Sequence, residues 1–149
     1  MIDRFKFRVW DNIHKRYIYC DFAGYCSVDY SGNGEKRIVF MPSGVEQIKN
    51  GRPLLYAKED EAKIEQCTGL KDKNGKLIYE GDIVLKSDVN AIGYSRTRVC
   101  KVHWHNDWLS WAITTQYGDT YELSEFEPQQ YEIIGNIHEN TDLLEVNND

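Results

Sequence analysis

The sequence predicts a mainly β protein with little helix, in which a β-rich subdomain over residues 1–65 packs on a small barrel over residues 66–149. Two observations lead to this prediction. Apolar and polar side chains alternate with a period of two in many short segments, which is typical of half-buried strands. Turn sequences rich in glycine, asparagine and aspartate separate these segments. A chain of 149 residues can bury roughly 70% of its unfolded surface, which is enough for a core without disulfides or metal.

The N-terminal block is expected to contain short strands and no long helix. Its first strand is predicted from Phe5, Phe7 and Val9, which alternate with charged or larger residues. A Ser-Gly-Asn-Gly sequence at 31–34 predicts a hairpin turn. Residues 54–66 are ambiguous, because their charged centre fits either a helix or a connector. The expected elements are strands at 5–10, 16–22, 25–30 and 36–41, a turn at 11–15 and a loop at 42–53.

The C-terminal block is expected to hold short strands joined by tight turns, which is typical of a small barrel. Residues 87–97 contain small and polar side chains and predict an exposed loop or a wide hairpin tip. Asn140 or Thr141 could cap a short helix through Leu143 and Leu144 near the end of the chain. The expected strands lie at 64–70, 77–79, 83–85, 98–105, 108–116 and 131–137.

Several residues of this block are interpreted as structural turn residues. Glycine can adopt positive φ without a steric penalty, and we expect Gly75 to do so in its Asn-Gly turn. Aspartate side chains accept hydrogen bonds from the backbone at turns. The turn residues predicted in this way are Gly69, Asp72, Asn74, Gly75, Gly81 and Asp82.

The clearest hairpin joins residues 98–105 to residues 108–116. If Asn106 and Asp107 form a two-residue loop, one face of the hairpin must be core. That face would carry Val102, Trp104, Leu109, Trp111 and Ile113, and the other would carry His103, His105, Trp108 and Ser110. We expect the second face to be exposed and to contribute to a contact, because tryptophan is enriched at interface hot spots. The alternative is a longer loop with Trp108 in the core.

Charge is distributed unevenly along the sequence. The net charge is -6. Residues 1–101 hold 18 basic and 14 acidic side chains, a balance of +4, whereas residues 102–149 hold 10 acidic and no basic side chains, a balance of -10. Since nucleic-acid affinity depends on lysine and arginine, the last third is excluded as a general nucleic-acid surface. Phosphate contacts would come from Arg96, Arg98, Lys101 and the lysines at 71, 73, 76 and 86.

The cysteines and the hydropathy indicate a cytoplasmic protein. No apolar run is long enough to span a membrane, and the N-terminal segment has charges where a signal peptide needs an apolar stretch. The four cysteines are widely spaced and form no C-x-x-C motif. We therefore expect reduced, mostly buried thiols, no structural zinc and no membrane partner.

Catalytic and metal-binding arrangements find weak support, so we expect no enzyme activity, no cofactor and no bound metal. His103 and His105 share a strand face and could hold Zn²⁺ or Ni²⁺ only with a further ligand such as Asp107, His14 or His138. Glu80 and Asp82 flank a glycine, as acidic residues at turns often do, and nothing nearby indicates a sugar site. Cys100 and His103 would point to opposite faces of one strand, which argues against a nucleophile and its base.

One long segment resembles a known family signature. Residues 67–84 read C-T-G-L-K-D-K-N-G-K-L-I-Y-E-G-D-I-V, which is similar to the signature of the YopX family of phage and prophage proteins. The segment F-R-V-W-D at 7–11 resembles the family's opening motif, and I-G-N-I-H-E-N at 134–140 resembles its closing motif, with His138 in place of an aromatic residue. The resemblance implies an SH3-like barrel in the C-terminal block, a phage or prophage gene product of a Gram-positive host, and a tendency to form oligomers. It supplies no catalytic residues.

These observations predict a non-enzymatic phage or prophage accessory protein that binds protein, itself included. Open strand edges in the first 41 residues and the +4 and -10 portions of the chain favour a homo-oligomer. A phage or host protein is the other expected partner. The alternative is a small nucleic-acid-associated regulator that uses the basic segment 71–101. The candidate binding residues are His103, His105, Trp108, Arg96, Arg98 and Lys101.

Overall fold

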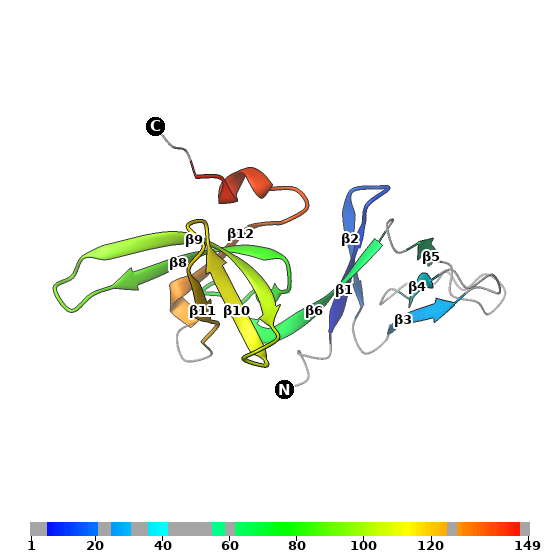
Figure 1. Ribbon diagram of the computed structural model, residues 1–149, viewed down its shortest axis with the longest axis horizontal. Helices are drawn as coiled ribbons and strands as arrows, with labels where there is room; N and C mark the ends of the chain where they lie inside the picture. Colours follow the sequence, from blue (N-terminus) through cyan, green and yellow to red (C-terminus); the bar gives the residue numbers. More distant parts are fainter. Residues whose placement is uncertain are drawn as a thin grey trace. The chain divides into compact units, whose positions relative to one another are not determined.

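The computed structural model describes residues 6–20, 25–30, 36–41, 55–58, 62–124 and 128–146 (Figure 1). Over residues 25–30, 36–41 and 55–58 it describes the backbone alone. The chain divides into two compact units, residues 1–67 and residues 68–149. The described residues are mainly β, with two short 3-10 helices, and none of their helices is long and apolar enough to cross a membrane. The predicted fold class is therefore confirmed.

The first unit contains an antiparallel sheet in which strand β1 (Phe7–Asp11) lies between β2 (Arg16–Cys20) and β6 (Ala62–Lys71). β1 and β2 are joined by the predicted turn. The side chain of Asp11 closes this turn by accepting hydrogen bonds from the backbone N–H groups of Ile13 and His14, both at 3.1 Å. Burial by itself would raise the pKa of Asp11, but hydrogen bonds from His14 and Arg16 outweigh it and lower the pKa.

A second sheet of the first unit has the strand order β3-β4-β5. Its strands are β3 (Tyr25–Tyr30), β4 (Lys36–Met41) and β5 (Leu55–Lys58). β3 and β4 form an antiparallel hairpin in which Tyr30 pairs with Lys36, so the predicted hairpin is confirmed. The ambiguous segment 54–66 forms strands over its described residues 55–58 and 62–66, which excludes a helix there. The expected loop at 42–53 lies outside the described residues.

The second unit is built on a five-stranded antiparallel sheet with the order β11-β10-β9-β8-β12. β6 continues into this unit, where β7 is its neighbour in the sheet. The 3-10 helix η3 (Pro128–Gln130) precedes β12. The strands of the unit are β7 (Leu77–Tyr79), β8 (Asp82–Val89), β9 (Ser95–His105), β10 (Ser110–Thr115), β11 (Thr120–Glu122) and β12 (Tyr131–Asn136).

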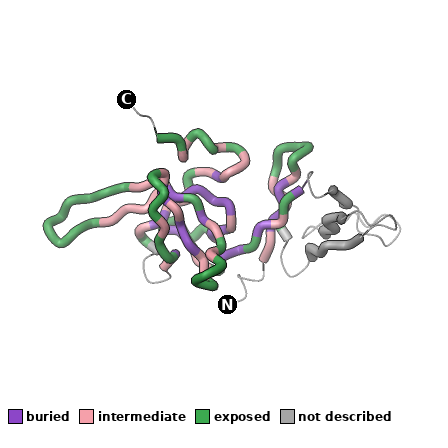
Figure 2. Tube along the Cα trace, in the orientation of Figure 1, coloured by how far each residue is buried: buried purple, intermediate pink, exposed green. Residues whose placement is uncertain are grey.

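The core of the second unit is an apolar cluster contributed by several of these strands (Figure 2). Its two members on β9, Cys100 and Val102, lie at alternate positions, as the period of two requires. Leu70, Trp111 and Ile133 pack against the cluster from positions that are partly exposed. The buried members are Ile78, Val84, Cys100, Val102, Ile113, Leu123 and Tyr131.

The β9–β10 hairpin differs from the prediction by a register shift of two residues. His105 pairs with Ser110 and Trp104 with Trp111, so residues 106–109 form a four-residue turn rather than a two-residue loop. Leu109 closes this turn with a φ of 51°, a conformation that is uncommon for a non-glycine residue. A shift of two keeps the parity of each strand, so Val102 and Ile113 are still buried as predicted. The assignment of Trp104 and Leu109 to the core was wrong, because both are exposed.

Two further elements differ from the sequence-based prediction. β8 and β9 extend beyond the expected 83–85 and 98–105 and form a long ribbon that closes at a tip of residues 90–94. The C-terminal element is a 3-10 helix, η4 (Thr141–Leu144), and Asn140 makes no capping hydrogen bond to it. The Asn140 side chain instead accepts a hydrogen bond from the backbone N–H of Asn136, at 3.1 Å.

Candidate interaction surface

The long signature segment builds turns through a buried aspartate. Oδ1 of Asp72 accepts hydrogen bonds from the backbone N–H groups of Asn74 and Lys76, both at 2.9 Å. Oδ2 of the same carboxylate accepts a hydrogen bond from the backbone N–H of Ile133 on β12, at 3.1 Å. One side chain therefore closes its own turn and also ties that turn to a strand 61 residues away in sequence.

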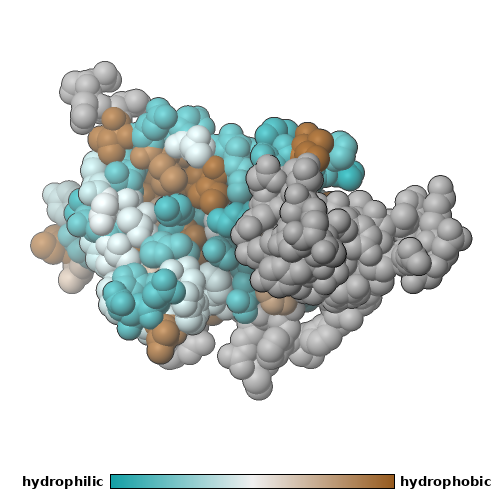
Figure 3. Space-filling model, turned by 45° about the vertical axis from the view of Figure 1, so that its right-hand side comes forward, coloured by the Kyte–Doolittle hydropathy of each residue, from teal (hydrophilic) through white to brown (hydrophobic). Residues whose placement is uncertain are grey.

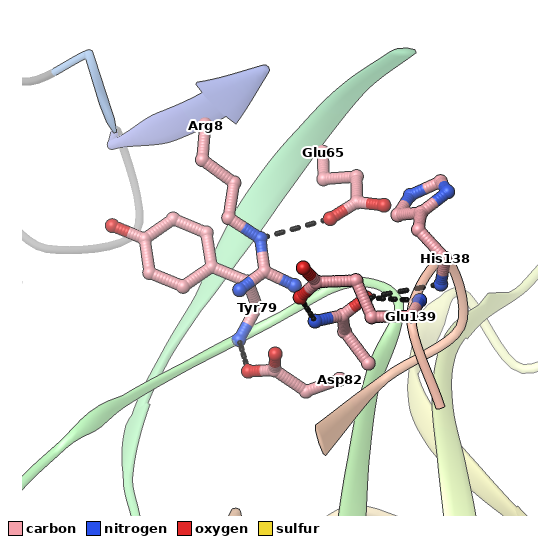
Figure 4. Close-up of polar contacts among 7 residues, drawn as sticks. Arg8, Glu65, Tyr79, Asp82, His138 and Glu139 are labelled. Atoms are coloured by element: carbon pink, nitrogen blue, oxygen red, sulfur yellow. Dashed lines mark hydrogen bonds and ion pairs between the residues drawn. The ribbon is translucent and has the colours of Figure 1, made fainter. Parts of the chain in front are cut away.

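The glycines of this segment occupy the left-handed region. Gly69, Gly75 and Gly81 have φ values of 82°, 78° and 82°. Next to Gly81, Oδ2 of Asp82 accepts a hydrogen bond from the backbone N–H of Tyr79 at 2.8 Å (Figure 4). These contacts agree with a structural interpretation of the signature, since Asp72 and Asp82 both accept hydrogen bonds from the backbone at turns.

The closing segment at 134–140 forms a further turn around Asn136. Oδ1 of Asn136 accepts hydrogen bonds from the backbone N–H groups of His138 and Glu139, both at 3.0 Å, and its Nδ2 donates to Glu139 at 2.8 Å (Figure 4). A Cβ on Gly135 would lie 2.6 Å from Oδ1 of Asn140, so glycine is required for this close approach.

In the opening segment, Arg8 takes part in a buried ion pair. Its Nε donates to the carboxylate of Glu65 at 2.8 Å, joining β1 to β6 inside the first unit (Figure 4). The guanidinium also lies 4.0 Å from the centre of the Tyr17 ring, a cation–π arrangement. Both charged side chains are buried, so this pair holds the sheet together and is not presented to a ligand.

Aromatic side chains gather at the β9–β10 turn. The ring of Trp108 stacks on His105 with centroids 4.0 Å apart and an interplanar angle of 15°. The backbone N–H of Trp108 also donates to Nδ1 of His105 at 3.3 Å, which fixes the turn. Trp108 is nevertheless 48% exposed. The face with His103 and His105 therefore ends in a tryptophan that is held in place and faces solvent.

The opposite face of the same hairpin end is also aromatic. Trp104 packs edge-to-face on Trp111 with ring centroids 5.3 Å apart, and 43% of Trp104 remains exposed. Leu109 is 75% exposed at the tip of the turn. We call Trp104, His105, Asp107, Trp108 and Leu109 the aromatic end. Figure 3 shows hydrophobic residues lying among hydrophilic ones on the surface of the described chain.

The basic candidates lie toward the other end of β9, on the β8–β9 ribbon. Arg98 donates from Nη2 to Asp88 at 2.8 Å, and the ammonium of Lys86 contacts the same carboxylate. The Arg98 guanidinium also lies 5.1 Å from the Tyr121 ring. Arg96 and Lys101 are exposed and form no ion pair within the described part of the chain. Since Arg96 and His105 are nine residues apart on one strand, they are separated by about 30 Å along it, with Arg98 and Lys101 between them.

The ribbon ends in an apolar hairpin tip, which is one of the two alternatives predicted for residues 87–97. Ile92 is 82% exposed and Tyr94 is 74% exposed, and Val89 is also exposed. Figure 2 shows both strands of the tip exposed. The sequence signal for this tip is the presence of Val89, Ile92 and Tyr94 among polar and small residues. A loop that is fully exposed to solvent has no need for large apolar side chains.

The described residues favour neither metal binding nor thiol chemistry. His103 uses both ring nitrogens, with Nδ1 at 3.2 Å from the Trp104 carbonyl oxygen and Nε2 at 2.7 Å from Oγ1 of Thr114. No cluster of three potential metal-ligand side chains occurs within the ranges that the structure describes. Burial raises the pKa of the Cys100 thiol to about 11, although nearby Arg98 and Lys86 act in the opposite direction. A thiol with this pKa is a weak nucleophile near neutral pH.

A family model for the YopX protein matches residues 6–145, which is nearly the whole chain. The chain belongs to the YopX family. Among solved structures, it is similar to the YopX protein of Bacillus subtilis, with 23% identity, a TM-score of 0.57, and coverage of 95% of this chain and 99% of that one.

It is also similar to a protein of Enterococcus faecalis, with 24% identity, a TM-score of 0.57, and coverage of 94% of this chain and 97% of that one. At these identities the solved structures support the YopX fold alone. The comparison with curated proteins finds no match.

Proposed function

We propose that this YopX-family protein is a non-enzymatic phage or prophage accessory protein that acts inside the bacterial cell by binding protein, including other copies of itself. The observation that carries the proposal is the half-exposed Trp108, stacked on His105 at the aromatic end. Family membership supports the phage or prophage context. The buried free thiols of Cys67 and Cys100 suit a reducing compartment.

The aromatic end has the properties of a protein contact. Tryptophan combines a large apolar area with a hydrogen-bonding N–H group and is enriched at interface hot spots. Because His105 already holds the Trp108 ring in place, binding would cost little additional side-chain entropy. Trp104, on the opposite face of the hairpin, and Leu109, at the tip of the turn, supply further exposed apolar surface.

A non-enzymatic role is supported by the hydrogen bonds that the polar side chains form within the fold. The carboxylates of Asp72 and Asp82 bind backbone N–H groups at turns. His103 is engaged through both ring nitrogens, and the Cys100 thiol has a raised pKa. These groups serve the fold, which leaves them poorly suited to general acid–base or nucleophilic chemistry.

Sedimentation of the full chain at micromolar concentration, together with capture from a nuclease-treated bacterial lysate, tests the proposal. We expect the wild type to sediment as more than one chain or to capture a protein in stoichiometric amount, and Trp108→Ala to weaken that binding at least tenfold. Tyr117→Ala, at another exposed aromatic residue of the same unit, is the matched control and should bind like the wild type. A wild type that stays monomeric and captures nothing would contradict the proposal.

A nucleic-acid-associated role is the second candidate, because the structure brings Arg96 and Arg98 together on one ribbon with Lys101 further along β9. Such a ribbon could follow a phosphate backbone. The positive charge of this ribbon is partly neutralised within the chain, because Asp88 forms ion pairs with both Lys86 and Arg98. A gel shift at two salt concentrations tests this role: binding that falls steeply with salt supports it, and no shift at low salt argues against it.

A further inference from the structure

The β8–β9 ribbon presents an apolar tip with a basic strand behind it. Ile92 and Tyr94 are among the most exposed large apolar residues in the described part of the chain. Behind the tip, residues 86–101 hold four basic side chains and one acidic, a balance of +3. A partner that removed these exposed apolar side chains from water would stabilise the complex through the hydrophobic effect.

The complementary surface lies at the other end of the same strand. The aromatic end exposes Trp108, Trp104 and Leu109. Asp107, in the same turn, is exposed and forms no ion pair among the described residues. The aromatic end lies in the segment 102–149, which carries ten acidic and no basic side chains. An apolar tip next to Arg96 and an aromatic turn that carries Asp107 are complementary in both hydrophobicity and charge.

The two surfaces cannot meet within one chain. They lie at opposite ends of β9, about 30 Å apart along a continuous strand. We propose that the tip of the β8–β9 ribbon of one copy docks on the aromatic end of a second copy, with Arg96 of the first opposite Asp107 of the second. Ile92 and Tyr94 then pack against the exposed Trp108 ring and Leu109. This contact joins different patches of the two copies, so it closes either as a reciprocal pair or as a ring.

This inference rests on the self-association part of the proposed function and specifies its surfaces. The apolar part is tested with Ile92→Ser and Tyr94→Ser, which alter exposed tip residues and leave the core intact. Sedimentation of each variant is compared with that of Ile13→Ser, an exposed apolar position in the first unit. We expect each tip variant to weaken self-association at least tenfold and the control to leave it unchanged.

The polar part is tested by charge reversal. Arg96→Glu alone and Asp107→Lys alone place like charges opposite each other in every contact, and we expect each to weaken self-association about tenfold or more at low salt. In an equimolar mixture of the two variants, the carboxylate introduced in one variant faces the ammonium introduced in the other at one contact. The native residues Arg96 and Asp107 face each other at the second contact. We therefore expect the mixture to recover the wild-type mass.

Three outcomes overturn the inference. One is a wild type that self-associates while the tip variants behave like Ile13→Ser, which would leave the proposed function standing. Another is a mixture of the charge variants that stays as weakly associated as each variant alone. The last is a monomeric wild type whose tip variants lose salt-sensitive binding to duplex DNA, which would assign the ribbon to nucleic acid and also remove self-association from the proposed function.

Discussion

The two units of the chain use buried charge in different ways. The first unit buries a complete ion pair between neighbouring strands, Arg8 on β1 and Glu65 on β6. The second unit buries an apolar cluster and keeps its carboxylates Asp72 and Asp82 at turns, where backbone N–H groups satisfy them. The first unit therefore depends on a buried ion pair, whereas the second depends on an apolar cluster and on carboxylates that bind turn backbone.

The largest expected effect is the loss of Glu65. Glu65→Ala removes the carboxylate that accepts a hydrogen bond from Nε of the buried Arg8, and we expect the first unit to lose about 3–5 kcal/mol of stability. Hydrogen exchange of residues 6–20 and 62–67 measures this loss. Lys63→Ala, an exposed position on the same strand, is the control. Protection in Glu65→Ala equal to that of the control would show that the pair does not hold the sheet.

The Asp72 carboxylate provides the corresponding test in the second unit. Asp72→Ala removes the acceptor of three backbone hydrogen bonds, and we expect a loss of about 2–3 kcal/mol by urea unfolding. Asp72→Asn should fall between Ala and the wild type, because an amide oxygen can keep the 72–76 turn while its NH₂ cannot accept from Ile133. Equal stability of Asp72→Asn and the wild type would argue against the link to β12.

A backbone effect without any lost contact is expected at Gly75. Its φ is 78°, and nothing lies within 4 Å of where a Cβ would be, so a substitution there changes backbone strain alone. Gly75→Val should cost about 1–2 kcal/mol and lower the melting temperature of the second unit by several degrees. Gly75→Asn should cost less, since asparagine tolerates this region. An unchanged melting temperature in Gly75→Val would contradict the turn geometry.

An effect confined to alkaline pH is expected from Cys100. Its pKa is raised from 9.0 to about 11 by burial, so above pH 9 the unfolded thiol ionises before the folded one does. The unfolded state then binds fewer protons, and the stability of the second unit falls as the pH rises from about 9 to 11. Urea midpoints across this range should fall more steeply for the wild type than for Cys100→Ser. Parallel slopes would show that the thiol does not contribute.

Many elements of the fold could be predicted because their signals are local. The hairpin of 25–30 and 36–41 follows from strand alternation and its glycine-rich turn. The positive φ of Gly75 follows from the Asn-Gly pair. The parity of β9 correctly placed Val102 in the core, since a shift of two residues does not change the face of a strand.

The errors arose where a particular side-chain contact, which strand alternation and turn composition do not specify, decided the outcome. The Asn106-Asp107 pair favours a two-residue loop, but stacking of His105 on Trp108 and the left-handed Leu109 close a four-residue turn. The side chain of Asn140 suits a helix cap but bonds to the backbone of Asn136. The Arg8–Glu65 ion pair joins residues 57 positions apart, and no sequence period indicates such a pairing.

By itself the sequence determined the family through its motif segments. It also determined the mainly β class and most strand and turn positions, because side-chain alternation specifies strands, and glycine and aspartate specify turns, over only a few residues. Beyond Trp108, tertiary structure decided which large side chains remain in solvent. It left Trp104 and Leu109 exposed, and it formed residues 86–98 into a ribbon whose tip presents Ile92 and Tyr94. Exposure depends on which strands continue past their neighbours and on where a turn closes, and both are set by pairing between segments distant in the sequence.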